Sequence, residues 1–397
     1  MNRAFACCAL SLLLSSGCVL TEDFDRYTIA PTRDGGEDGG GGGEPCDRVD
    51  TVYVARGGDD ANDGTLEAPL ATIAAAMAKV HGDNALSRVY VGAGTFETTY
   101  ESPDEIVLVD GVILRGGFSD DFCTYDPAAN VTVIAQKFGE GADVDPAASP
   151  IVTIRGDDLG AGVTLEGFRV SIGNETDDDH LGVRIRNTSV VVRDVMIVDG
   201  DGRSMTGMII DGAEAATLER VTVAMDNASH DCFGVRLFDV GAANVGELIV
   251  DRTISTNGLQ SVGLSATYLN GGKSYSIAVD GSRIHGGRGA SSSRAVWISD
   301  QQSTANAVTM RLTNNLLHGG ESTSPSYGLL IEGSSRNADI FHNTIYTGEN
   351  GPFGYGIVYT YSGAGADIRN NIVFSGQSMH FCVWRQGGTA WSGDNET

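Results

Sequence analysis

The chain has 397 residues, of which 54 are glycine and 9 are proline, and only 7% are aromatic. This composition suits short strands joined by tight turns better than long helices. The 26 basic residues against 52 acidic ones give a formal net charge of -26. Such a charge argues against nucleic acid as a partner, because little in the sequence could neutralise phosphates.

The N-terminus predicts export. Arg3 precedes an apolar run that ends at Leu14, and this run is too short to span a membrane, so residues 1–17 are predicted to be a signal peptide. The stretch Ser15-Ser16-Gly17-Cys18 resembles a bacterial lipoprotein cleavage box, with Cys18 as the lipidated residue. We therefore expect a lipid anchor in the outer membrane or at the cell surface; a secreted, soluble protein is the alternative. Residues 18–45, rich in glycine and acids, are predicted to be a flexible tether.

Short strands of two kinds alternate from about residue 163 onward. The first kind reads LGVRI, TGMII, FGVRL, VGLSA, RAVWI, YGLLI, YGIVY and, more loosely, HFCVW. Their second positions lie 25 to 33 residues apart: Gly182, Gly207, Gly234, Gly263, Ala295, Gly328, Gly356 and Phe381. The second kind reads VTLEGFRV, VVVRDVMIV, ATLERVTV, NVGELIV, IAVDGSRI, MRLTNNLL, DIFHNTIY and DIRNNIVF. We expect the apolar residues after its polar bend to be equivalent: Phe168, Val195, Val221, Leu248, Ile284, Leu316, Ile345 and Ile372.

A period of this length, built from short strands without a helical pattern, is typical of a solenoid whose units bury their apolar faces by stacking. The sequence predicts an all-β, right-handed parallel β-helix with coils about 4.8 Å apart. Asn314-Asn315, Asn343 and Asn370-Asn371 fall at equivalent bends of the last three coils. We expect their side chains to form a hydrogen-bonded ladder along the axis, and asparagine also tolerates the left-handed backbone of a sharp bend.

The coil count also bears on the cysteines. Cys232 and Cys382 lie on strands five coils apart, or roughly 24 Å at the usual strand spacing, which is too far for a disulfide. Cys46 and Cys123 are therefore the predicted pair. Cys232 and Cys382 are expected to be buried thiols.

The stretch YVARGGDDANDGT, from Tyr53 to Thr65, continues into PLATIAAAMAKV. Together they resemble the entry module of bacterial right-handed parallel β-helix proteins, in which a strand and a glycine- and aspartate-rich loop lead to a short helix that caps the coil stack. A later stretch, VILRGGF, resembles a segment near the start of similar surface proteins. The resemblance implies an entry and cap region at residues 46–135 and β-helix coils at residues 136–397.

The same module occurs in family 9 polysaccharide lyases, which cleave pectic polymers with calcium-binding aspartates and a lysine base. The three lysines here do not match that role: Lys79 belongs to the capping helix, and Lys137 and Lys273 lack a strand with matched aspartates. Arginine could serve as the base instead. Arg184, Arg186 and Arg236 lie on strands of the first kind, where we expect them to be solvated partners of nearby acids.

Two acidic loops are candidate calcium sites. Asp59 and Asp63 fit positions 1 and 5 of an EF-hand loop, but Ala61 and Leu70 stand where ligands are needed, which favours a turn. The run NETDDDH contributes Asp177, Asp178 and Asp179, which could bind calcium or keep a loop soluble.

Aromatic residues gather late in the chain. Tyr355, Tyr359, Tyr361 and Trp384 are candidates for a platform that stacks on sugar rings. The sequence thus favours a non-catalytic, structural or glycan-binding surface lipoprotein with an extracellular polysaccharide as its partner. The alternative is a lyase or glycoside hydrolase that acts on acidic glycans, although the net negative charge would repel such polymers unless calcium bridged them.

Overall fold

The computed structural model describes residues 46–99, 106–137, 151–173, 178–255, 260–269, 273–289, 291–301, 308–333, 337–361, 366–374 and 380–386. The chain divides into two compact units, residues 1–33 and 34–397, and every described residue belongs to the second. The predicted signal peptide, Cys18 and the predicted tether lie outside the described residues.

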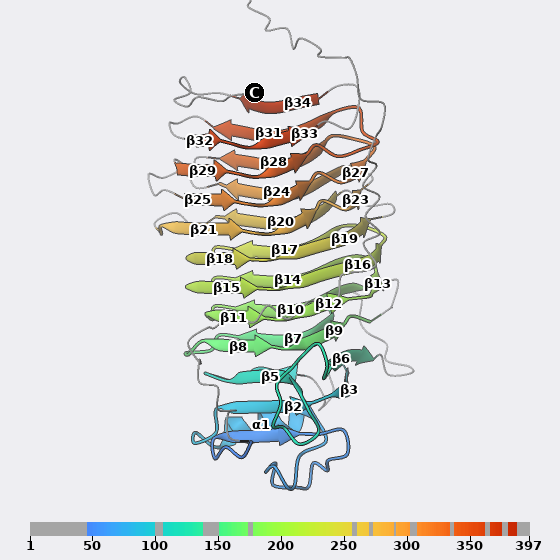
Figure 1. The fold of residues 1–397 in the computed structure, drawn as a ribbon, viewed down its shortest axis with the longest axis vertical. Coiled ribbons are helices and arrows are strands. Elements are labelled where there is room, and N and C mark those ends of the chain that lie inside the picture. Colours follow the sequence, from blue (N-terminus) through green and yellow to red (C-terminus); the bar gives the residue numbers. More distant parts are fainter. Residues whose placement is uncertain are drawn as a thin grey trace, which may run out of the picture. The chain divides into compact units, whose positions relative to one another are not determined.

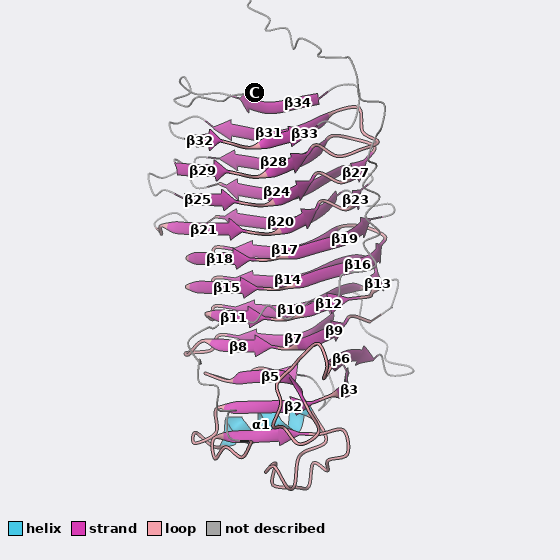
Figure 2. Ribbon diagram, viewed as in Figure 1, coloured by secondary structure: helices cyan, strands magenta, loops and turns pink. Residues whose placement is uncertain are grey.

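The described part of the chain forms three sheets, in which every pairing between neighbouring strands is parallel (Figures 1 and 2). Sheet A has 11 strands: β1 (Thr51–Val54), β2 (Arg88–Gly92), β5 (Ile113–Phe118), β8 (Val163–Glu166), β11 (Val190–Arg193), β15 (Ala215–Glu219), β18 (Ala242–Gly246), β21 (Tyr275–Asp280), β25 (Val308–Thr313), β29 (Asn337–Phe341) and β32 (Ala366–Arg369). Sheet C has 10 strands: β4 (Ile106–Val107), β7 (Ile151–Asp157), β10 (Asp179–Arg186), β14 (Ser204–Asp211), β17 (Cys232–Phe238), β20 (Gln260–Tyr268), β24 (Ser292–Asp300), β28 (Ser326–Gly333), β31 (Gly354–Tyr361) and β34 (His380–Gln386).

Sheet B has 13 strands. Its main path consists of β3 (Gly94–Thr99), β6 (Thr132–Lys137), β9 (Phe168–Ser171), β12 (Met196–Val198), β16 (Thr222–Ala228), β19 (Ile249–Ser255), β22 (Arg283–His285), β26 (Leu316–His318), β30 (Thr344–Tyr346) and β33 (Ile372–Phe374). The short strands β13 (Asp201–Gly202), β23 (Arg288–Gly289) and β27 (Glu321–Ser322) flank this path. The chain visits the sheets in turn, for example β11 in A, β12 in B and β14 in C, and then returns to pair β15 with β11. The predicted parallel β-helix is confirmed.

The two kinds of strand seen in the sequence become three strands per coil. Strands of the first kind form sheet C, and each strand of the second kind divides at its bend into one strand of sheet A and one of sheet B. The predicted equivalence of apolar residues after the bend is wrong for the last four of them. Ile284 and Ile345 are buried but align with Ile197, two residues beyond Val195. Leu316 and Ile372 point outward and are 43% and 56% exposed, because their register partner in β12 is Met196 and not the buried Val195.

The predicted asparagine ladder is confirmed. Oδ1 of Asn343 accepts hydrogen bonds from the backbone N and from Nδ2 of Asn315, at 3.0 and 2.9 Å, and Asn371 accepts from Asn343 in the same way. The ladder ends on Asn315 Oδ1, which accepts from the backbone N of Ser282. In earlier coils the equivalent inward position is held by the apolar residues Val195, Val221 and Leu248, so the ladder continues an apolar column of the interior.

A column of glycines marks the junction of sheets C and B. A Cβ on Gly207 would lie 2.6 Å from the carbonyl O of Gly234 and 2.7 Å from Cγ1 of Val223 in sheet B, so a side chain has no room there. The strand register places Cys382, rather than Phe381, next to Gly356 in this column. Cys382 is exposed, which contradicts the prediction of a buried thiol, because no described strand of sheet C lies beyond β34. Cys232 is buried as predicted.

The helix α1 (Ile73–Gly82) lies against β1, β2 and β4 and buries Ile73, Ala76, Met77 and Val80. Its N-terminus is capped by Thr72, whose side chain accepts from the backbone N of Ala75 at 3.1 Å. No helix among the described residues is long and apolar enough to cross a membrane. Cys46 and Cys123 form a disulfide with a Cα separation of 4.7 Å, which ties the first described residue to the loop after β5.

Candidate functional site

Two outward-facing rows of side chains run along sheet C. In β17 the core residues Val235 and Leu237 flank Arg236, which therefore points outward. The register aligns one row as Arg184, Ile209, Arg236, Ser265, Trp297, Leu330, Val358 and Trp384. The second row is Leu181, Thr206, Phe233, Val262, Arg294, Tyr327, Tyr355 and Phe381. We call the following eight residues the arginine–aromatic face: Arg184, Arg236, Arg294, Trp297, Tyr327, Tyr355, Phe381 and Trp384.

Aromatic rings occupy the later coils of this face. The ring of Tyr355 stacks on those of Tyr327, Phe381 and Trp384 at centroid distances of 5.1, 5.2 and 5.1 Å. Tyr355 is consequently only 7% exposed and has no free ring face for a sugar, which corrects its predicted role in glycan stacking. Phe381 and Trp384 end the stack and are 44% and 40% exposed, so aromatic surface is accessible at β34.

The other two predicted stacking residues do not join the platform. Tyr359 is 2% exposed and belongs to the interior core, because it follows the inward-facing Ile357 at a spacing of two along β31. Its predicted contact with glycans is wrong. The side chain of Tyr361 lies outside the described residues.

Arg236 is a cation in an apolar setting. Its guanidinium carbon lies 4.2 Å from the ring centroid of Phe233 and 4.8 Å from that of Phe238. Its Nε is buried without a hydrogen-bond partner, and none of the described acids forms an ion pair with it. Burial lowers the pKa of Arg236 below its ordinary value, since desolvation disfavours the charged form, although Asp231 opposes this effect.

Arg294 repeats this arrangement two strands further along sheet C. Its guanidinium carbon lies 4.7 Å from the ring centroid of Trp297 and 5.7 Å from that of Tyr327. Burial also lowers the pKa of Arg294, with Glu332 as the main opposing charge. One amino group donates to Oε1 of Gln260 at 2.9 Å, while Nε is buried and unpartnered. The two guanidinium groups are therefore held by rings and only incompletely by acids.

Asp231 connects the two arginines without forming an ion pair with either. Its Oδ1 accepts from the backbone N of Gln260 at 3.1 Å, and the Gln260 side chain in turn accepts from Arg294. The negative charge of Asp231 partly offsets the lowering of the pKa of both Arg236 and Arg294 by burial. One carboxylate thus acts electrostatically on two partly desolvated cations.

The remaining arginines predicted on these strands have acidic partners. Arg184 donates to Oδ2 of Asp157 at 2.7 Å, and Arg186 lies 4.0 Å from Asp211. Of the three, only Arg236 lacks an ion pair with a described acid; Arg184 is paired as expected but is not solvated, with its side chain 13% exposed. Sequence reasoning missed Arg294 and Trp297, although a signal was present. Positions 1 and 4 of the pentapeptides from LGVRI to YGIVY, read as columns, give both rows of the face up to β31.

The predicted calcium loops serve other roles. Asp59 Oδ1 accepts from the backbone N of Ala61, and Asp60 accepts from the backbone N of Ala71 and from Thr72, so these carboxylates close the turn before α1. None of the described residues donates a hydrogen bond to the side chain of Asp63, and Asp177 lies outside the described residues.

In the second acidic loop, an arginine forms an ion pair with one of the predicted calcium ligands. Arg203 donates two hydrogen bonds of 2.8 Å to Asp179, which lowers the pKa of that carboxyl, and the backbone N of Arg203 donates to the Asp178 carbonyl. Within the described ranges, no three His, Cys, Asp or Glu side chains are grouped to bind a metal ion. The four predicted ligands that are described, Asp59, Asp63, Asp178 and Asp179, are therefore not part of a group that could hold a metal ion.

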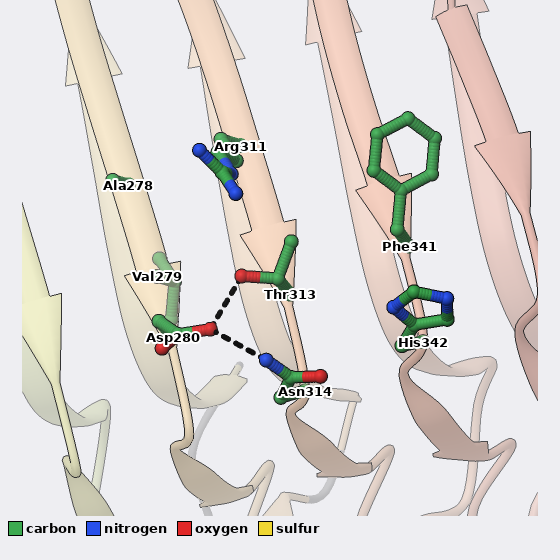
Figure 3. Close-up of a pocket in the computed structure, with 8 residues that line it drawn as sticks. All are labelled: Ala278, Val279, Asp280, Arg311, Thr313, Asn314, Phe341 and His342. Carbon is green, nitrogen blue, oxygen red and sulfur yellow. Dashed lines mark hydrogen bonds between the residues drawn. The ribbon is translucent and has the colours of Figure 1, made fainter.

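A concave feature lies on sheet A. A groove of about 450 Å³ crosses β21, β25 and β29 and is lined by Ala278, Val279, Asp280, Arg311, Thr313, Asn314, Phe341 and His342 (Figure 3). Its floor includes the small residue Ala278, whose register partner is the long Arg311. The groove lies on a different sheet from the arginine–aromatic face.

Three parallel sheets, wound by successive coils and capped by α1, define the molecule as a parallel β-helix protein. Residues 56–271, more than half of the chain, match the family described as protein of unknown function (DUF1565), and the chain belongs to this family. No curated protein matches the sequence.

Several solved structures are similar to this chain. Pectate lyase Pel9A has 13% identity and a TM-score of 0.47, with coverage of 83% of this chain and 79% of that chain. A rhamnogalacturonan lyase has 12% identity and a TM-score of 0.33, covering 84% of each chain. The A-module of the mannuronan C-5 epimerase AlgE6 from Azotobacter vinelandii has 15% identity and a TM-score of 0.34, covering 82% of this chain and 94% of that chain. Similarities at this level carry no argument about activity.

Proposed function

We propose that this protein is an exported, membrane-anchored β-helix that binds an acidic extracellular glycan through the arginine–aromatic face of sheet C, without converting it chemically. The observation that carries the proposal is Arg236, a largely buried guanidinium held between Phe233 and Phe238 with no ion pair to any described acid. A buried cation is costly unless it is paired, and a carboxylate or sulfate on a glycan would complete it.

The guanidinium groups and aromatic rings of this face also support a glycan as the ligand. Arginine presents a fork of donors that matches a carboxylate, and exposed aromatic rings offer apolar surface to a sugar ring. The face provides the first at Arg236 and Arg294 and the second at Phe381 and Trp384. Stacked strands repeat about every 4.8 Å, so an extended polymer that lies along the coil axis would meet a new side chain at each coil.

The net charge of -26 does not prevent such binding. Exposed charges are screened over about 8 Å at physiological ionic strength, whereas a partly buried guanidinium is screened much less. Long-range repulsion should therefore slow the approach of a polyanion, while the local attraction at Arg236 decides the lifetime of the complex. We expect the association rate with polygalacturonate to rise as salt increases from low ionic strength, which is the opposite of ordinary electrostatic steering.

The proposal is tested by measuring the affinity of the full-length protein for polygalacturonate, a sulfated glycan and neutral dextran. Replacement of Arg236 by Gln should weaken binding of the acidic polymers about tenfold or more, since hydrogen bonds to charged groups contribute about 1.5–3 kcal/mol. Trp384→Ala should weaken it less. The matched controls are Arg193→Gln, an arginine of sheet A that pairs with Glu219, and Phe374→Ala, an exposed ring of sheet B; neither should change affinity. Equal binding by Arg236→Gln and the parent protein would contradict the proposal.

One observation favours an enzyme as the second candidate function. The lowered pKa of Arg236 is a property that a proton-abstracting base would need, and such a base would make the protein a lyase of acidic glycans. Incubation with polygalacturonate, with and without calcium, distinguishes the two functions. New absorbance from unsaturated products, lost in Arg236→Gln, would replace the binding function by lyase activity.

The proposed location is tested separately. Cys18→Ser should move the protein from the membrane fraction to the soluble exported fraction, because a lipid chain on Cys18 would be the anchor. Cys7→Ser is the matched control and should leave the distribution unchanged. If the Cys18 variant remains in the membrane fraction, lipidation at this position is wrong.

A further inference from the structure

Arg311 in the groove on sheet A differs from the other arginines of its sheet. Arg193 donates to Glu219 at 2.7 Å, and Arg369 is paired with Asp367. Arg311 is exposed, and no hydrogen bond or ion pair holds its guanidinium among the described residues. Its register partners are the small Ala278 on β21, which also lines the groove (Figure 3), and Asp339 on β29, with which it forms no ion pair.

The neighbouring strand β21 contributes a carboxylate in a fixed position to the groove. Oδ1 of Asp280 accepts hydrogen bonds from the hydroxyl of Thr313 and from Nδ2 of Asn314, the second at 3.0 Å (Figure 3). The second oxygen, Oδ2, remains available to a donor. Asp280 and Arg311 line the same groove and form no ion pair with each other, so the groove presents separated negative and positive charges.

The groove is built on a rigid base. Asn314 and His342 have left-handed backbones, with φ of 57° and 56°, and each precedes a buried residue of the asparagine ladder, Asn315 or Asn343. The ladder fixes the bends from which these side chains project, so little order must be gained when a ligand binds. The ring of Phe341 forms an apolar wall beside Arg311 (Figure 3).

We propose that this groove is a second binding site, for a small molecule that carries a carboxylate at one end and a hydrogen-bond donor at the other. The carboxylate pairs with the guanidinium of Arg311, the donor with Oδ2 of Asp280, and an apolar side of the ligand packs on Phe341. A volume of about 450 Å³ falls in the range of small-molecule sites. A free acidic sugar, whose donor is a hydroxyl, and an amino acid, whose donor is an ammonium, share this chemistry.

Ligand-observed NMR and calorimetry on the full-length protein test the site. The probes are two matched pairs, D-galacturonate with D-galactose and L-phenylalanine with phenethylamine, in which the second member lacks the carboxylate. At least one carboxylate should bind about tenfold or more tightly than its partner, and Arg311→Gln should abolish this difference. Arg193→Gln, which removes a paired arginine from the same sheet, should leave it intact.

A second variant separates the two sources of ligand. Asp280→Asn keeps an acceptor for a hydroxyl but loses the charge that attracts an ammonium, so it should weaken phenylalanine about tenfold and galacturonate only slightly. The site is wrong if neither carboxylate binds, if the matched neutral compounds bind equally well, or if Arg311→Gln has no effect. None of these variants touches the arginine–aromatic face, so failure here is distinct from failure of glycan binding on sheet C.

Discussion

Removal of the Asn343 side chain tests whether the asparagine ladder stabilises the later coils. Asn343 is 1% exposed; its Oδ1 accepts from the backbone N and Nδ2 of Asn315, and its Nδ2 donates to the Leu312 carbonyl at 2.9 Å. Asn343→Ala removes the acceptor of two buried N–H groups of Asn315, its backbone N–H and one N–H of Nδ2, whose other hydrogen still binds the Val279 carbonyl. Each abandoned group costs about 1–3 kcal/mol, so we expect a loss of about 4 kcal/mol in the local free energy of unfolding.

Hydrogen exchange at the Asn315 amide is the appropriate assay, since stacked coils open locally and a single global transition is not assured. A loss of about 4 kcal/mol corresponds to an increase of the exchange rate by about three orders of magnitude. Asn343→Val should recover apolar packing, as at Val195 and Val221, but should not restore protection of the Asn315 amide. Asn337→Ala, at an exposed position of β29, is the control and should change little. If Asn343→Ala raises the exchange rate by less than about tenfold, the ladder contributes less than its hydrogen bonds imply.

Three further perturbations follow from the fold. Gly207→Ala should destabilise the β-helix by about 1–3 kcal/mol, because its Cβ would lie 2.6 Å from a carbonyl oxygen, whereas Gly57→Ala meets no atom within 4 Å and should be neutral; equal midpoints in urea would contradict this. His285 stacks on His318 at 4.2 Å, and burial lowers its pKa from 6.5 to about 3. As pH decreases, His285 therefore binds a proton in the unfolded chain before it does so in the folded protein. The free energy of unfolding is at its full value above about pH 6.5 and falls by at most about 1.4 kcal/mol per pH unit as pH decreases toward 3. Thermal melts between pH 7 and 5.5 should show this slope in the parent protein and a smaller one in His285→Asn. Calcium at about 1 mM should leave the melting temperature unchanged. Asp60→Ala should lower the free energy of unfolding by about 1 kcal/mol, because Asp60 closes the turn that leads into α1. If calcium raises the melting temperature and the Asp59→Ala, Asp63→Ala double variant loses this effect, the loop is a metal site after all.

Much of the fold could be predicted because one physical constraint repeats in every coil. Glycine recurs where sheet C meets sheet B, and asparagine recurs where the chain must bend and satisfy buried backbone groups, so the period was visible in the residues themselves. The errors arose at the last coils. The repeat pattern places HFCVW one residue out of frame, and it predicts a buried Cys382 although no described strand of its sheet lies beyond β34.

The binding face was harder to predict, since it depends on which side of a strand each residue takes. The sequence alone does not distinguish Tyr359 from a surface ring. The strand register places it on the same inward side of β31 as Ile357, two residues earlier. Arg236 looked like an ordinary surface arginine, and only the rings of Phe233 and Phe238 set it apart. A strand sequence gives the alternation of side chains, but the burial of an outward residue depends on its neighbours in adjacent coils.

The central claim is that Arg236 binds an acidic group of a glycan. Equilibrium binding of the full-length protein to polygalacturonate, measured for the parent, Arg236→Gln and Arg193→Gln in one buffer, addresses it most directly. We expect the parent and Arg193→Gln to bind alike and Arg236→Gln to bind at least about tenfold more weakly. Equal affinity for all three proteins, or no binding by the parent, would contradict glycan recognition at this face.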